Sequence, residues 1–180
     1  METALLLLIL QGLLGAFDTL YYHEFRLRLP TSSTAIKELK LHAVRDFLYT
    51  VIFASLAWQT WNGLWSWGLV AFLAAEVVIT LWDFLKEDRS RKVSPGERSM
   101  HAIMGIVYGA FVAILLPELV GWSRLPTGFG QADYGLISWM LSLMAVGVFV
   151  SGWRDFLAGW TRVMAKHAHP RDAVEITRRS

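Results

Sequence analysis

Five long apolar stretches alternate with shorter polar stretches along the 180-residue chain. They cover approximately Ala4–Tyr22, Leu41–Trp61, Leu64–Leu85, His101–Val120 and Tyr134–Trp153. Each has about 20 residues, which is the length that an α-helix needs to cross roughly 30 Å of hydrocarbon. They are rich in Leu, Ala and Met and poor in turn residues, unlike the strands of a membrane β-barrel. The pattern therefore predicts an all-α, polytopic membrane bundle with five transmembrane helices.

The ends of these stretches predict how the chain is organised. We expect the first stretch to be retained as a helix, because Asp18 and Tyr21 occupy the place of a signal-peptide cleavage site and no basic residue precedes the apolar run. Ser94, Pro95 and Glu97 form a capping-box pattern that predicts a helix start. Residues 1–166 are expected to form a single integral membrane domain, followed by a flexible cytoplasmic tail at residues 167–180.

Basic residues are distributed very unevenly between the polar stretches. Of the 17 Lys and Arg residues, only Arg124 lies between the second and third spans or between the fourth and fifth. Because cytoplasmic loops carry the excess of Lys and Arg, this asymmetry predicts an outside N-terminus and a cytoplasmic C-terminus. The protein would then be a multi-pass protein of a cell membrane, most simply the inner membrane of a bacterium. The basic loops would contact anionic lipid headgroups, and no nucleic-acid partner is indicated.

The amino-acid composition excludes several classes of protein and several kinds of functional site. Charged residues make up 18% of the chain, against about a quarter in a soluble domain. The chain has no cysteine, which excludes a disulfide scaffold, thiolate zinc sites, iron–sulfur clusters and cysteine nucleophiles. Hydropathy resembles that of membrane desaturases and hydroxylases, but their His-box motifs need more histidines than the five present.

Ionisable residues gather at one depth, near the cytoplasmic ends of the spans. Helical spacing brings residues three, four or seven apart onto one face, so each span contributes polar groups to a common layer. The layer contains six acids against two arginines, Arg45 and Arg154, and this surplus needs protons, metal ions or a charged substrate. The candidate ligands are His42, Asp46, Asp83, His101, Glu76, Asp18, His23, Glu38 and Glu97.

Mixed histidine and carboxylate ligands from several helices are how di-iron and di-manganese sites are built in helical bundles. The leading hypothesis is therefore a metal centre, with iron or manganese as the metal, that supports membrane-associated redox chemistry on a lipid-soluble substrate. Haem held by His42 and His101 is the weaker cofactor hypothesis.

The alternative is a non-enzymatic membrane protein, either a proton-coupled carrier or an accessory subunit. Its buried charges would then form a proton relay or structural ion pairs, such as Arg45 with Asp83 and Arg154 with Asp18. Gly105 and Gly109 are spaced for close packing of two helices.

Overall fold

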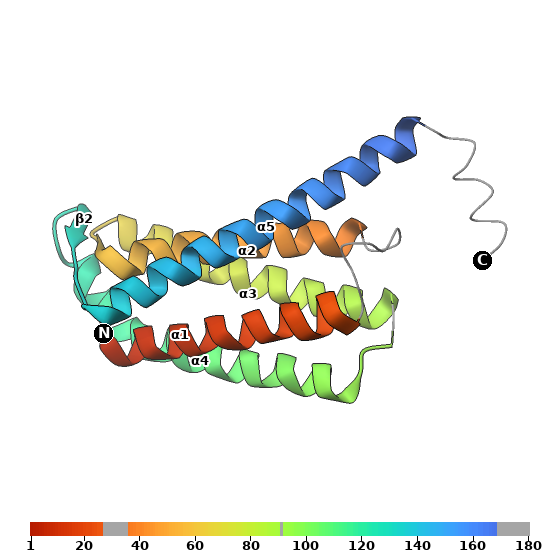
Figure 1. The fold of residues 1–180 in the computed structure, drawn as a ribbon. Helices are drawn as coiled ribbons and strands as arrows, with labels where there is room; N and C mark the ends of the chain where they lie inside the picture. The colour runs from red at the N-terminus through yellow and green to blue at the C-terminus, as the bar shows by residue number, and fades with distance from the viewer. Residues whose placement is uncertain (27–35, 91, 169–180) are drawn as a thin grey trace.

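The computed structural model of the chain describes residues 1–26, 36–90 and 92–168, and these fold into a helical bundle with one small sheet (Figure 1). The helices are α1 (Glu2–Phe17), the π-helix η1 (Asp18–Arg26), α2 (Ile36–Trp58), α3 (Trp65–Ser90), α4 (Pro95–Ser123) and α5 (Leu136–Ala168). The strands are β1 (Gln59–Asn62) and β2 (Gly128–Gln131). The prediction of a helical fold is confirmed, and each predicted span overlaps a helix, although the second predicted span ends inside β1 and the first ends inside η1.

Four helical segments are long and apolar enough to cross a membrane: Glu2–Tyr22, Trp65–Lys86, Pro95–Ser123 and Leu136–Thr161. Large apolar side chains on their outer faces are exposed, for example Leu6, Ile106 and Val146. Surfaces of this kind are costly in water and are favourable against lipid. The fold is therefore compatible with a multi-pass membrane protein.

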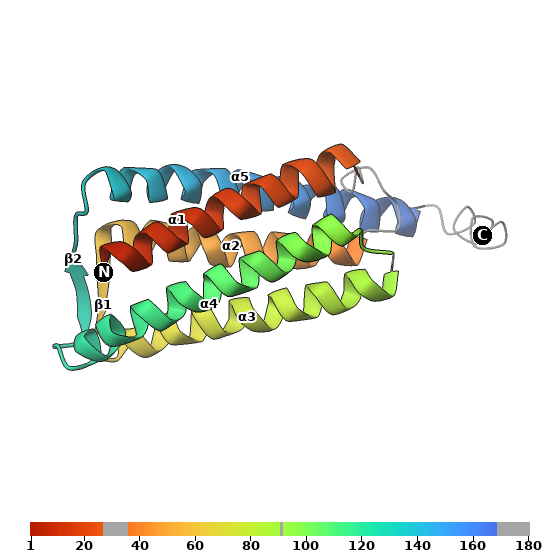
Figure 2. The same ribbon diagram turned by 90° about the horizontal axis from the view of Figure 1, so that it is seen from below.

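The five α-helices lie side by side around a common centre. Contacts are most extensive between α2 and α5 and between α1 and α4, and α3 joins the two pairs by packing on α2 and α4. Figure 2 shows α1 and α4 crossing the face of the bundle between α5 on one edge and α3 on the other. Two boundaries of this ring are loosely packed, namely α1 against α5 and α3 against α4.

The end of the bundle that holds Met1, β1 and β2 is called the sheet end here. Strands β1 and β2 pair antiparallel, with Trp61 opposite Phe129, and the two rings meet edge to face at 5.1 Å. Gly63 follows β1 with φ +58°, and an added Cβ would lie 2.6 Å from the Cα of Thr127. This position therefore requires glycine. The pairing of β1 with β2 was not predicted, because two four-residue strands far apart in sequence carry little local signal.

The opposite end, where η1 lies, is called the η1 end. Helix α4 begins there with the predicted capping box: the Ser94 hydroxyl accepts from the Glu97 backbone N–H at 3.3 Å, and the Glu97 carboxylate accepts from the Ser94 N–H at 3.4 Å. Helix α1 widens into η1 at Asp18, a change that the sequence did not predict. Helix α5 continues to Ala168, past the predicted boundary at Lys166, and residues 169–180 of the predicted tail lie outside the described residues.

Candidate functional site

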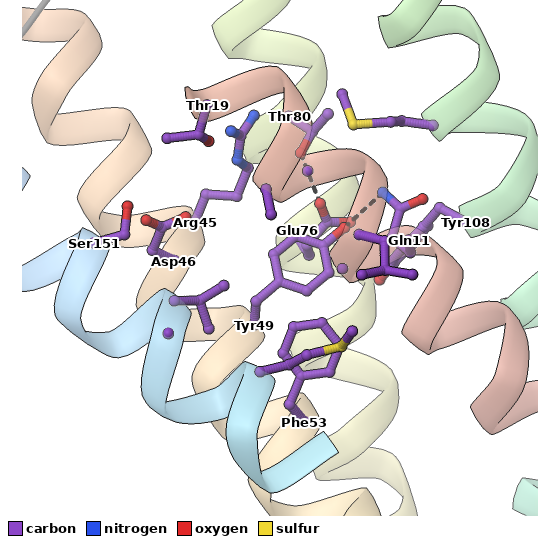
Figure 3. Close-up of a pocket in the computed structure, with 18 of the residues that line it drawn as sticks. Gln11, Thr19, Arg45, Asp46, Tyr49, Phe53, Glu76, Thr80, Tyr108 and Ser151 are labelled. Carbon is purple, nitrogen blue, oxygen red and sulfur yellow. Dashed lines mark hydrogen bonds between the residues drawn. The ribbon is translucent and has the colours of Figure 1, made fainter. Parts of the chain in front are cut away.

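A cavity of about 750 Å³ lies inside the bundle, and all five α-helices and η1 contribute to its wall (Figure 3). Most lining residues are apolar or glycine. The polar ones are Gln11, Thr19, Glu24, Arg45, Asp46, Tyr49, Glu76, Thr80, Tyr108, Ser151 and Arg154. A volume of this size is typical of small-molecule sites, which combine apolar walls with a few polar groups.

The cavity reaches the outer surface of the bundle at its two loosely packed boundaries. Leu13 of α1 and Leu143 of α5 line the cavity and are also 55% and 74% exposed. On the other side, Leu81 of α3 lines it and is 56% exposed. If the four apolar segments span a membrane, both openings face the hydrocarbon layer.

Gly105 and Gly109 contribute to the second opening, and their predicted role is wrong. The spacing predicted a face for close helix packing, but a Cβ added at either position would meet nothing within 4 Å. Both glycines line the cavity instead. Their lack of a side chain enlarges the space between α3 and α4.

Glu76 of α3 is the carboxylate in the middle of the cavity. It is 2% exposed, and its Oε1 accepts from the Thr80 hydroxyl one turn along α3, at 2.7 Å. The phenol groups of Tyr49 from α2 and Tyr108 from α4 lie near this carboxylate. Among the described residues, no Lys, Arg or His forms an ion pair with Glu76.

Gln11 of α1 completes this central group. Its amide nitrogen donates to the Tyr49 hydroxyl at 3.2 Å, while its buried Oε1 has no hydrogen-bond partner among the described residues. Tyr108 donates to the Leu73 backbone carbonyl at 3.2 Å. Figure 3 shows Gln11, Tyr49 and Glu76 pointing toward one another across the cavity. We call Gln11, Tyr49, Glu76 and Tyr108 the central cluster.

A second group of charges lies between the central cluster and the η1 end. Asp83 Oδ2 is 3.0 Å from His42 Nε2 and 3.4 Å from Arg45 Nη1, which confirms the predicted pairing of Arg45 with Asp83. The other ring nitrogen of His42, Nδ1, is 4.0 Å from Asp155 Oδ2 of α5. All four side chains are largely buried, so Asp83 is compensated by two basic groups from α2.

A separate pair joins η1 to α4. His101 Nε2 is 3.5 Å from Asp18 Oδ2, and the His101 ring stacks on Phe84 of α3 with centroids 4.2 Å apart. Asp18 is placed for this contact because it stands where α1 passes into η1. The two histidines at this depth therefore contact different aspartates: His42 contacts Asp83 and Asp155, and His101 contacts Asp18.

Arg154 of α5 contacts the carboxylates of Glu24 and Asp155, with Asp155 Oδ1 at 2.9 Å from Nη2. The predicted pairing of Arg154 with Asp18 is therefore wrong, and Asp18 contacts His101. The error arises because η1 turns Glu24, rather than Asp18, toward α5.

The predicted layer of metal ligands is divided among these groups. His42 and Asp83 share one pair, Asp18 and His101 another, and Glu76 lies in the cavity. Asp46 lines the cavity beside Arg45, and Glu97 caps α4. The side chains of His23 and Glu38 lie outside those that the structure describes. Among the described residues, no three His, Asp or Glu side chains come together in a group that could hold a metal ion.

Sequence reasoning missed Gln11 as a member of the site. The sequence does indicate that Gln11 faces the bundle interior. It is an uncharged amide in the middle of an otherwise apolar run, and polar groups in such positions usually face inward. Comparison with known proteins adds no further assignment, because no family model, curated protein or solved structure matches the chain.

Proposed function

We propose that this protein is a membrane carrier that binds a lipid-soluble molecule in the cavity, with Glu76 as its proton-exchanging group. The observation that carries the proposal is the central position of Glu76: a carboxylate 2% exposed, inside an apolar cavity, with no ion-pair partner among the described residues. A carboxylate in such surroundings is costly when ionised and uncompensated. A bound proton, or a ligand that compensates the charge, removes this cost.

We also propose that the chain crosses the membrane five times. Helix α2 would be a fifth span, since its 23 residues are long enough and it packs against both α3 and α5. Its mean hydropathy is reduced by Arg45 and Asp46, and the structure supplies buried partners for Arg45. The N-terminus would be outside and the C-terminus cytoplasmic in a bacterial cell membrane, with the basic loops against anionic lipid headgroups.

The two openings of the cavity, between α1 and α5 and between α3 and α4, favour a lipid-soluble ligand. A molecule dissolved in the bilayer reaches the cavity between α1 and α5 or between α3 and α4 without crossing water. The structure of the sheet end also favours entry from the side. Strands β1 and β2 cover that end of the bundle, and there the Met1 ammonium pairs with the Glu118 carboxylate at 2.6 Å.

Binding of N-phenyl-1-naphthylamine, a neutral lipophilic fluorophore, tests the cavity. The purified protein in lipid nanodiscs is titrated with the fluorophore, and the signal of empty nanodiscs is subtracted. Gly109→Phe places a ring in the open space of the cavity and is expected to weaken binding at least tenfold. Gly121→Phe is the matched control, because it lies on the same helix, also faces open space and does not line the cavity. Equal binding by both variants and the unmodified protein would refute the proposal.

A further inference from the structure

The central cluster presents more acceptor positions than donors to the cavity. The Tyr108 hydroxyl donates to the Leu73 carbonyl and one Gln11 N–H donates to the Tyr49 hydroxyl, which leaves the second Gln11 N–H and the Tyr49 O–H as donors. The acceptors left for a ligand are the Glu76 carboxylate and the unpartnered, buried Oε1 of Gln11. Gln11 is 8% exposed, and a buried acceptor without a donor is costly. The acceptors of the site therefore outnumber its donors, and no basic group among the described residues pairs with Glu76.

Aromatic rings surround the same position. Tyr49 stacks on Phe53 with centroids 5.6 Å apart, and Tyr49 meets Tyr108 edge to face at 6.2 Å. All three rings line the cavity. The faces of aromatic rings attract cations, and the attraction is strongest where water is excluded.

The charges on the surrounding helices leave this position negative. On α2, Arg45 is paired with Asp83 and lies beside Asp46. On α5, Arg154 is held by Glu24 and Asp155. The described lining residues of α1 and α4 include no charged side chain. Glu76 is thus the lining carboxylate whose charge no neighbouring basic group offsets.

We infer that the ligand is a lipophilic organic cation, whose positive centre is bound by Glu76 and Gln11 between the rings of Tyr49, Phe53 and Tyr108. This inference rests on the proposed function and names its substrate class. Binding to the protonated site releases one proton: the Glu76 O–H bond breaks, the proton goes to water, and the carboxylate remains as the counter-ion of the cation. Proton and cation therefore compete for one group, which is the requirement for exchange across a membrane.

Tetraphenylphosphonium is the probe, since it is a lipophilic cation with no proton to exchange. Its binding to the protein in nanodiscs is measured by equilibrium dialysis against empty nanodiscs, beside triphenylphosphine oxide as a neutral analogue. We expect the cation to bind at least tenfold more tightly than the neutral analogue. Glu76→Gln retains the acceptor for Thr80 and is expected to remove this preference, whereas Glu2→Gln, an exposed change on α1, leaves it unchanged. Calorimetry in two buffers of different ionisation enthalpy should show proton release that disappears in Glu76→Gln.

The outcomes separate the two proposals. If cation and neutral analogue bind equally in the unmodified protein and in Glu76→Gln, but Gly109→Phe weakens both, the cation inference is wrong and cavity binding stands. If neither compound binds and N-phenyl-1-naphthylamine binding is also insensitive to Gly109→Phe, both proposals fail.

Discussion

Asp83 and Glu76 lie two turns apart on α3, and both are almost completely buried, yet their surroundings are opposite. Asp83 faces His42 and Arg45 from α2. Glu76 faces a cavity, two tyrosines and an amide, and has no ion pair among the described residues. A buried acid with matched basic partners mainly holds helices together, and its removal leaves the partners uncompensated. A buried acid without them is available to a proton or a ligand.

The largest effect on stability is expected from Asp83→Asn. The change leaves the Arg45 guanidinium buried without its carboxylate, and breaking a buried ion pair in this way costs about 3–5 kcal/mol. The melting temperature of the protein in mild detergent should fall accordingly. Asp88→Asn on the same helix, whose exposed carboxylate pairs with exposed Arg98, should change stability by less than about 1 kcal/mol. An equal loss of stability in Asp83→Asn and Asp88→Asn would mean that the buried ion pair of Asp83 contributes no more than an exposed one.

An intermediate effect is expected from His101→Ala. The change removes both the ring that stacks on Phe84 and the partner of Asp18, and a loss of about 1–3 kcal/mol follows. His101→Phe retains an aromatic ring for Phe84 but not the contact with Asp18. Its melting temperature should lie between those of His101→Ala and the unmodified protein. If His101→Ala and His101→Phe have the same melting temperature, the stacking on Phe84 contributes nothing to stability.

The smallest effect on stability is expected from Glu76→Gln. Glutamine keeps the acceptor for the Thr80 hydroxyl and breaks no ion pair among the described residues, so the free energy of unfolding should change by less than about 1 kcal/mol. Thermal unfolding without ligand measures this. A loss as large as that of Asp83→Asn would mean that Glu76 is structural, and the comparison with Asp83 would fail.

Much of the local structure follows from sequence patterns. The helix at each apolar stretch, the capping box at Ser94 and the pairing of Arg45 with Asp83 were all predicted. These features depend on residues close in the chain or on the strong rule that buried charges are paired. Helical periodicity likewise put Glu76 and Thr80 on one face, where they form a hydrogen bond.

The division of the polar layer into separate groups was not predicted, because residues at equal depth on different helices can face different neighbours. The structure divides the layer by helix order and rotation: α2 against α3 brings His42 to Asp83, and η1 against α4 brings Asp18 to His101. Neither property is encoded in the spacing within one helix.

Sequence alone thus determined that the chain forms long apolar helices with acids buried among them, because hydropathy and helical period are local properties. Tertiary structure decided which acids are compensated. It also decided that Gly105 and Gly109 widen a cavity rather than bring helices together, and that Gln11 meets Tyr49 beside Glu76. The physical reason is that compensation of a buried charge depends on distances of a few ångströms between separate helices, and only their packing fixes those distances.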